Sequence, residues 1–353
     1  MENQKVSLAD IAAKLNLSKS AVSRGLRNLP GVSPHIARKT QRVAADMGYK
    51  ASPYRANKSL CVGMIFPDSS SPNSPHFKEI LAIAERHLSL SGMHLMVHYI
   101  QQPLPPVLPQ LIKDNRVDGV VLAGYHQINF INLLKTSGKP IVAVNNLTSR
   151  TSCDCVISNP WPGTSDLLKR LTALGHKRIA LVLSDRIYPT VERRYQAFIL
   201  GMNECGHSSI ADLILENYDA TIGGGAMAVA ELLSRHAIPS AIVFVNDWMA
   251  LGGMMELTRR GLRIPEDISI ASYDNTYFCE ETLPRLTSVD LHIEKSVVSA
   301  IDELLTLITE GSSREADQFT QREVSSELVW RDSCAAAKTC VCNEVKFLNR
   351  SSG

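Results

Sequence analysis

The spacing of apolar positions changes once along the chain, near residue 61. Before it, apolar residues recur every three or four positions, which is typical of short amphipathic helices. After it, apolar runs of strand length lie at 61–66, 94–100, 118–123, 140–144, 178–183, 241–245 and 268–273. Helical patterns separate them, for example at 76–91, 160–175, 193–205, 223–236 and 248–261. This alternation predicts parallel sheets with helices on both faces.

Residues 7–17 carry the signals of one helix followed by a tight turn. Ser7, with Asp10 three residues later, has the form of a capping box. Asn16 then tolerates the left-handed backbone that a sharp turn requires. One helical stripe is formed by Leu8, Ile11, Ala12 and Leu15. The segment therefore predicts the first half of a helix-turn-helix.

The segment after this turn predicts a helix with a polar outer face. Ser18 can cap it, and Ala21, Val22 and Leu26 supply its apolar side. The outward residues are Lys19, Ser20, Ser23, Arg24 and Arg27. Such a face offers charge for phosphates and short polar groups for base edges. A third helix is expected from Ser33-Pro34 to about Met47, with Gly48 as its stop.

Charge is distributed unevenly along the chain. Residues 1–60 hold 11 Lys or Arg and 3 Asp or Glu, a net charge of +8. The whole chain carries only +2, so residues 61–353 carry −6. A basic head on a mildly acidic body is the electrostatic pattern of nucleic-acid binding.

Length and composition indicate a soluble protein with more than one domain. A chain of 353 residues exceeds one ordinary core. The N-terminus has no apolar signal region and no stretch is long enough to span a bilayer, so a cytoplasmic protein is expected. The pairs Cys153/Cys155 and Cys340/Cys342 lack partners at zinc-like spacing, so reduced thiols are expected, with no metal and no cofactor.

Several motifs resemble one known family in the right order. LADIAAKLNLSKSAVSRGL, VSP and GY resemble the headpiece of the lac/gal repressor (LacI/GalR) family, and VDGVVLAG, LTALGHKRIALV, AIVFVNDWMALG and RGLRIPEDISIASYDNT resemble its body. The resemblance covers residues 5–333. It implies an all-α helix-turn-helix headpiece and an α/β body of two Rossmann-like lobes, similar to periplasmic binding proteins.

The resemblance also implies a division of the chain. Residues 1–49 are expected to form the DNA-binding domain, 50–60 a short hinge, and 61–333 a two-lobed effector-binding and dimerisation domain, with 334–353 as a flexible tail. Crossings between the lobes are expected near 158–162, 286–292 and 320. The tail lacks the leucine heptads of a tetramerising coiled coil.

The function that the resemblance implies is a DNA-binding transcriptional regulator, expected to be a repressor. A homodimer would bind a near-palindromic operator, and a sugar or sugar derivative between the lobes would control it. The expected DNA-binding residues are Ser18, Lys19, Ser20, Ala21, Ser23, Arg24 and Arg27. The expected effector-binding residues are Ser69, Thr190, Arg194, Asn246 and Asp274. His76 and Phe77 lie where the family often places further contacts.

Some of these residues also have ordinary structural interpretations. Asp247 is expected to cap the helix that follows it, and Trp248 to pack rather than to stack on a sugar. Asn145 and Asn159 stand where the family often has Asp, so the ligand class stays open and a regulator without an effector remains possible. Only 13 residues separate Tyr49 from Gly63, which leaves the family's hinge helix in question.

Three other functions fit the sequence less well. An extracytoplasmic solute-binding protein would share the two-lobed body but would not need the basic helix-turn-helix head. An α/β enzyme is not expected, because the chain has no phosphate loop, no G-x-S-x-G and no His/carboxylate metal set. The run Gly223–Gly225 is better explained by flexibility at a helix start. A nucleoid-type architectural protein would not need so large a body.

Overall fold

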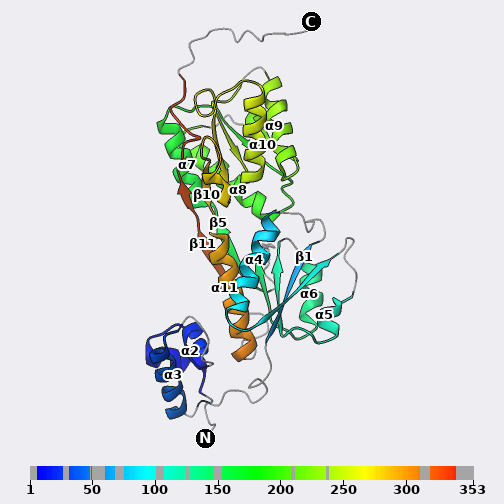
Figure 1. The fold of residues 1–353 in the computed structure, drawn as a ribbon. Helices are drawn as coiled ribbons and strands as arrows, with labels where there is room; N and C mark the ends of the chain where they lie inside the picture. Colours follow the sequence, from blue (N-terminus) through cyan, green and yellow to red (C-terminus); the bar gives the residue numbers. More distant parts are fainter. Residues whose placement is uncertain are drawn as a thin grey trace. The chain divides into compact units, whose positions relative to one another are not determined.

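The computed structural model describes residues 6–26, 32–47, 49, 60–67, 75–100, 107–124, 127–145, 153–207, 211–235, 238–310 and 319–338. The predictions made for Arg27, Gly48, Ser69, the 50–59 joint and the Cys340/Cys342 pair lie outside these residues. Figure 1 shows the described elements from α1 to β12.

The headpiece consists of α1 (Leu8–Leu15), α2 (Lys19–Leu26) and α3 (Pro34–Asp46). The capping box of Ser7 and Asp10 is confirmed, as is the left-handed Asn16, whose φ is 53°. Ser33 caps α3, with Pro34 in its first turn. The three helices enclose a small core of Leu8, Ile11, Ala12, Val22 and Ala44. This core lets the headpiece hold its own shape.

The chain divides into two units that interleave in sequence. The first comprises Met1–Asn159 and His292–Val324, and the second Pro160–Leu291 and Ser325–Gly353. The chain thus passes between units after residues 159, 291 and 324. The first two passages lie at the predicted crossings, and the third lies four residues beyond the predicted 320. Each unit contains one six-stranded sheet.

The sheet of the first unit has the order β11-β5-β4-β3-β1-β2. Its strands are β1 (Cys61–Pro67), β2 (His94–Ile100), β3 (Gly119–Ala123), β4 (Ile141–Val144), β5 (Asp154–Asn159) and β11 (Gln321–Ser325), and its helices are α4 (Pro75–Ser89), α5 (Gln110–Lys113), α6 (Ile128–Lys135) and α11 (Ile293–Glu310). The pairs from β1 to β5 are parallel. Met64 and Ile65 belong to different apolar clusters, so this sheet is buried on both faces.

Leu60 belongs to the core of the first unit. Its side chain is 7% exposed and packs in the cluster that contains Val62 and Met64. Its carbonyl accepts a hydrogen bond from His94 N at 2.8 Å, which continues the β1–β2 pairing by one residue. Leu60 therefore contributes to the hydrophobic core and the sheet of the first unit.

The sheet of the second unit has the order β12-β10-β9-β8-β6-β7. Its strands are β6 (Ile179–Val182), β7 (Ile214–Leu215), β8 (Ala241–Phe244), β9 (Ser269–Tyr273), β10 (Thr287–Asp290) and β12 (Glu327–Val329). Its helices are α7 (Trp161–Ala173), α8 (Pro189–Glu204), α9 (Ile222–Ser234) and α10 (Asp247–Arg259), with the short η3 (Ala211–Leu213) and η4 (Tyr277–Glu280). The β12 strand is antiparallel to β10.

One helix of the second unit begins earlier than the sequence pattern predicts. α8 begins at Pro189 and not at 193, because a proline fits the first turn of a helix and Tyr188 stands at the N-cap. Arg194 therefore lies in the second turn and does not start the helix.

The interpretation of the Gly223–Gly225 run as flexible is wrong for Gly224 and Gly225, where a Cβ would collide with backbone oxygens. α9 and α10 pack side by side (Figure 1), and their glycines allow very close backbone contact. A Cβ on Gly225 would lie 1.9 Å from Met249 O, and one on Gly252 would lie 1.8 Å from Ile222 O. Gly225 and Gly252 are therefore required by packing.

The predicted tail begins too early in the sequence. Cys334 is 7% exposed, His176 Nε2 donates to Ala335 O at 2.8 Å, and Ala337 N donates to Leu174 O at 2.9 Å. Residues 334–338 are thus part of the second unit, while 339–353 lie outside the described residues. Among the helices that the structure describes, none has the length and hydropathy to cross a membrane.

Candidate DNA-reading helix and ligand site

α2 packs in the headpiece through one face, and its Arg24 Nη2 donates to Asp302 Oδ1 of α11 at 3.4 Å. Val22 and Gly25 are buried. A Cβ on Gly25 would lie 3.1 Å from Thr40 Oγ1, which shows how closely α2 approaches α3. Ser18 Oγ accepts a hydrogen bond from Ala21 N at 3.1 Å, so the predicted cap is confirmed. The helix is therefore fixed at its N-terminus and along its inner side.

The residues expected at DNA differ in their exposure. Ser18 and Lys19 are exposed, and the remaining described members of the set are half-buried: Ser20, Ala21, Ser23 and Arg24. On α3, Arg38 and Lys39 are exposed. Hydroxyls and cations of this kind can read base edges and hold phosphates.

In the second unit, three predicted effector residues converge at the carboxyl end of the sheet. Asn246 follows β8, Asp274 follows β9, and Arg194 reaches them from α8. Arg194 Nη2 donates to Asp274 Oδ1 at 2.7 Å, and Arg194 Nη1 donates to Val245 O beside Asn246. Ligands of parallel α/β sheets bind at this edge.

Asn246 has a structural role that the sequence assigned to its neighbour. Asn246 Oδ1 accepts a hydrogen bond from Met249 N at 2.8 Å and is the N-cap of α10. The expectation that Asp247 caps this helix is therefore wrong, because the cap is one residue earlier. The amide nitrogen of Asn246 lies 3.5 Å from Ala220 O, a long contact that a ligand oxygen could replace.

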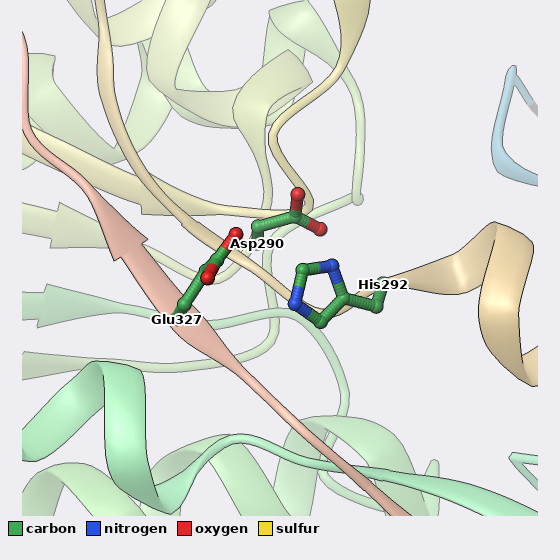
Figure 2. Close-up of side chains that lie close together, drawn as sticks. All are labelled: Asp290, His292 and Glu327. Carbon is green, nitrogen blue, oxygen red and sulfur yellow. The ribbon is translucent and has the colours of Figure 1, made fainter.

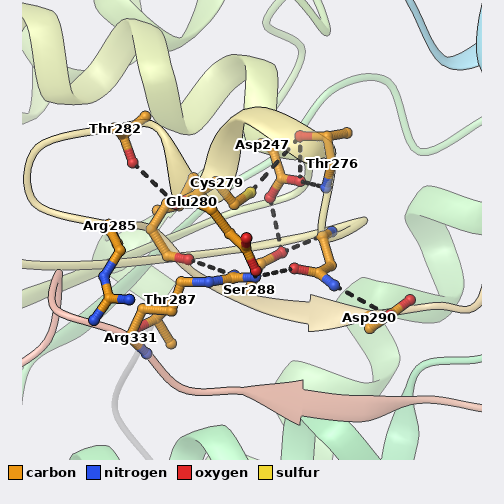
Figure 3. Close-up of polar contacts among 12 residues, drawn as sticks. Asp247, Thr276, Cys279, Glu280, Thr282, Arg285, Thr287, Ser288, Asp290 and Arg331 are labelled. Atoms are coloured by element: carbon orange, nitrogen blue, oxygen red, sulfur yellow. Dashed lines mark hydrogen bonds and ion pairs between the residues drawn. The ribbon is translucent and has the colours of Figure 1, made fainter.

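Asp247 is fully buried and accepts several hydrogen bonds (Figure 3). Burial raises the pKa of Asp247 to about 6, and the charge of Asp274 contributes a smaller increase. The hydrogen bonds that Asp247 accepts act in the opposite direction and lower its pKa. Burial likewise raises the pKa of the nearby Cys279 thiol, so this cysteine is not a reactive thiolate.

Aromatic side chains pack around this edge of the sheet. Trp248 meets Phe278 at a centroid distance of 4.7 Å and 65°, as expected for packing. Arg194 Cζ lies 5.4 Å from the centre of the Tyr273 ring. Burial raises the pKa of Tyr273 to about 12, and its hydroxyl lies 3.0 Å from Thr164 Oγ1. Thr190 is half-buried in the first turn of α8.

Two amides of the first unit are engaged in local structure. Asn145, with φ 55°, accepts a hydrogen bond from Ser158 N at 2.8 Å through Oδ1. Asn159 Nδ2 donates to Glu323 Oε2 at 3.0 Å. Both amides thus have protein partners at strand ends.

Phe77 and the Cys153/Cys155 pair serve the interior of the same unit. Phe77 packs edge-on against Phe66 at 5.3 Å, with the His76 ring 5.5 Å from Phe77. Cys153 and Cys155 are buried, and burial raises the pKa of Cys153 to about 12.

Asp290 and Glu327 face each other in the β10–β12 ladder (Figure 2). His292, drawn with them, belongs to the first unit. Like charges directly opposite each other are destabilising, and Asn275 Nδ2 relieves this by donating to Asp290 Oδ2 at 3.1 Å. Two carboxylates provide fewer ligands than a zinc or calcium site requires, so this pair alone does not form a metal site.

Comparison with known proteins shows what this geometry resembles. Residues 168–334 match the model of the periplasmic binding protein-like domain. The HTH-type transcriptional repressor PurR of Pasteurella multocida (strain Pm70) is 28% identical over 336 residues, covering 93% of this chain and 98% of the relative. The match therefore includes both the headpiece and the body.

Solved structures show the same fold. A LacI family regulator from Enterococcus faecium with bound ribose has a TM-score of 0.68 at 23% identity, covering 79% of this chain and all of that one. The lac repressor dimer bound to operator and the anti-inducer ONPF has a TM-score of 0.67 at 21% identity, covering 94% of this chain and all of that one. With its capped helix-turn-helix and two largely parallel sheets, the chain is similar over most of its length to the lac/gal repressor (LacI/GalR) family of transcription regulators.

Proposed function

We propose that this protein is a transcriptional repressor that reads an operator with α2 and is controlled by a small polar ligand. The observation that carries the proposal is α2 itself, which is capped by Ser18, packed through Val22 and Gly25, and turned outward at Lys19. A helix held in this way can enter a major groove as a rigid body. The relatives named as repressors support this function.

We propose a homodimer bound to a near-palindromic site. A single helix-turn-helix reads one half-site, and two-fold symmetry reads the other. The second unit exposes large apolar side chains: Met255 is 58% exposed, Tyr277 75% and Leu283 94%. Exposed apolar residues of this size support a subunit contact. The solved lac repressor relative is itself a dimer on its operator.

The proposed ligand is a sugar or sugar derivative held by Arg194, Asn246 and Asp274. A guanidinium donates in a fixed fork, a carboxylate accepts from hydroxyls, and an amide does both. These are the groups that a molecule rich in hydroxyls needs. The Enterococcus faecium relative binds ribose, which supports this ligand class. Thr190 is a further proposed contact at the start of α8.

The protein then acts by binding rather than by turnover, and its site of action is the nucleoid in the cytoplasm. Ligand and operator would affect each other's affinity by the same factor, because coupling between two sites is reciprocal. A typical factor is roughly 5–150-fold.

Selection from random DNA tests the first half of the proposal. The full-length protein should enrich one near-palindromic motif, and a Lys19→Ala variant should change it at symmetric positions. Enrichment of no motif, or of the same motif by the variant, would contradict the assignment of α2.

Thermal shift against a library of sugars and nucleosides tests the second half. A compound that binds only the folded state raises the melting temperature. The same compound should then change operator affinity. A library without a single stabilising compound, or with a stabilising compound that leaves operator affinity unchanged, would count against control by this class of ligand.

A further inference from the structure

Asp247 ties together two strands and one loop of the second unit. Figure 3 shows its bonds to Ser288 of β10 and to Thr276 of the loop. Its Oδ1 accepts hydrogen bonds from Ser272 Oγ at 2.5 Å and Ser288 Oγ at 2.8 Å. Its Oδ2 accepts from Thr276, through N at 2.7 Å and through Oγ1 at 2.9 Å. Four donors from β9, β10 and the loop after β9 therefore meet at one carboxylate.

The burial of this carboxylate implies a structural or functional role, because removing a charge from water is costly unless the charge is well hydrogen-bonded. Helix capping is not the reason, since Asn246 caps α10. The side chain is 0% exposed, so direct contact with a ligand from solvent is not the reason either. The donors themselves indicate the role, because two of the four come from Thr276, two residues after Asp274.

The loop that Asp247 holds has an unusual backbone. Asp274 has φ 106° and Asn275 has φ 54°, both in the left-handed range that residues with a Cβ rarely adopt. Such conformations persist where the surroundings over-determine them. Asp274 N donates to Val289 O at 3.0 Å, and Asn275 N donates to Ser288 Oγ at 3.0 Å. Ser288 thus links Asn275 directly to Asp247.

A second anchor holds the same loop from the other side. Arg331 Nη2 donates to Asn275 Oδ1 at 2.8 Å, and Arg331 Nη1 donates to Leu286 O at 2.9 Å. Arg331 therefore fixes the Asn275 side chain, while Asp247 fixes the backbone on both sides of it, at Asn275 N through Ser288 and at Thr276 N directly.

We propose that Asp247 is a positioning residue that holds residues 274–276 in the backbone that directs the Asp274 carboxylate to Arg194. This inference rests on the proposed ligand site at Asp274 and assigns that site a support that does not itself touch the ligand. Removal of the Asp247 charge should therefore disturb the geometry of the ligand site, although none of the proposed contact residues is itself replaced.

Amide hydrogen exchange on the full-length protein tests the positioning role without any ligand. In Asp247→Asn, one oxygen becomes an NH2 group that cannot accept from its donors. Exchange at Asn275 and Thr276 should rise about tenfold or more relative to Val243 in the middle of β8, because local opening precedes global unfolding. An unchanged rate at Asn275 and Thr276, or an equal rise at all three amides, would overturn the proposal.

Two serines provide a matched pair of variants. Ser272 and Ser288 both donate to Asp247 Oδ1, and both are fully buried, but Ser288 alone of the two accepts from Asn275 N. Ser288→Ala should accelerate exchange at Asn275, whereas Ser272→Ala should not. Equal behaviour of the two would contradict the link from Asp247 to the loop. This pair also decides the question if Asp247→Asn does not fold.

A ligand measurement separates this inference from the proposed function. Whichever sugar or nucleoside of the library stabilises the wild-type protein should bind Asp247→Asn at least about tenfold more weakly, a loss of about 1.4 kcal/mol. Normal binding by a variant whose loop exchanges faster would overturn the positioning role. A library without a stabilising compound for the wild-type protein counts against the proposed ligand class, and the exchange measurements then decide this inference alone.

Discussion

Arg194 and Asp274 form a nearly buried ion pair, with 2.7 Å between Nη2 and Oδ1 and with side chains that are 10% and 14% exposed. The two residues are 80 positions apart in sequence and come from α8 and from the loop after β9. Each is thus oriented by the other, and removal of either leaves a charge with one partner fewer.

The first prediction concerns this pair. Asp274→Ala and Arg194→Ala should each abolish the ligand response, because each removes a contact and releases the remaining side chain. Operator binding should persist, because the headpiece has its own core. Ligand titration and operator binding measured on the same preparations would check this. Asp332→Ala, which breaks the exposed pair with Arg285 in the same unit, is the control and should respond normally. A cognate ligand that binds both site variants with wild-type affinity would show that the site lies elsewhere.

The second prediction concerns base reading and phosphate contact. Lys19→Ala or Ser20→Ala should change preference at one position in each half-site, because a good base contact is worth roughly 1–3 kcal/mol of discrimination. Lys39→Ala on α3 should weaken all sequences alike and reduce the salt slope by about 1. Binding measured on the selected site and on its single-base variants, at several salt concentrations, separates the two effects. If Lys39→Ala changed base preference, the assignment of the two faces would be reversed.

The third prediction concerns Leu60, which lies where the family's hinge meets the body. Leu60→Ala should lower the free energy of unfolding by about 2–5 kcal/mol, because it leaves a cavity among Val62 and Met64. Denaturant unfolding measures this. Leu90→Ala, at a side chain 63% exposed, should change it by less than about 0.5 kcal/mol.

DNA bending gives the Leu60 prediction a second readout. The operator should be bent equally by wild-type protein and by Leu60→Ala, because the side chain is buried in the body and not available as a wedge. Bending can be followed by the mobility of circularly permuted operator fragments. Loss of a central kink at unchanged stability would show instead that Leu60 inserts into DNA.

The fourth prediction concerns two glycines of α9. Gly225→Ala should destabilise the second unit strongly, because the new Cβ would stand 1.9 Å from a backbone oxygen of α10. Gly223→Ala is the matched change two residues earlier, where the nearest atom would be 3.8 Å away. It should be neutral or stabilising by up to about 1 kcal/mol, since alanine favours helix. Melting temperatures of the two variants compare them, and equal tolerance would refute the close α9–α10 contact.

The sequence by itself predicted most of the secondary structure of this protein and indicated that its N-terminal head binds DNA. The capping box at Ser7, the turn at Asn16 and the Ser33-Pro34 helix start are local signals, since each depends on residues within one turn of the chain. The strands could also be predicted from the apolar runs, because a strand buried on both faces consists almost entirely of apolar residues. The resemblance to the LacI/GalR family followed from motifs in their order along the chain.

Only the tertiary structure decided which side chain does what at the ligand edge. Asn246 and Asp247 are adjacent in sequence and both suit a helix start, yet Asn246 caps α10 while Asp247 receives donors from as far away as Ser288. Gly225 and the first residues of the expected tail were misjudged for the same reason, because their partners come from distant segments. Local patterns report backbone preferences, whereas burial and hydrogen-bond partners depend on which distant strands and helices the fold brings together.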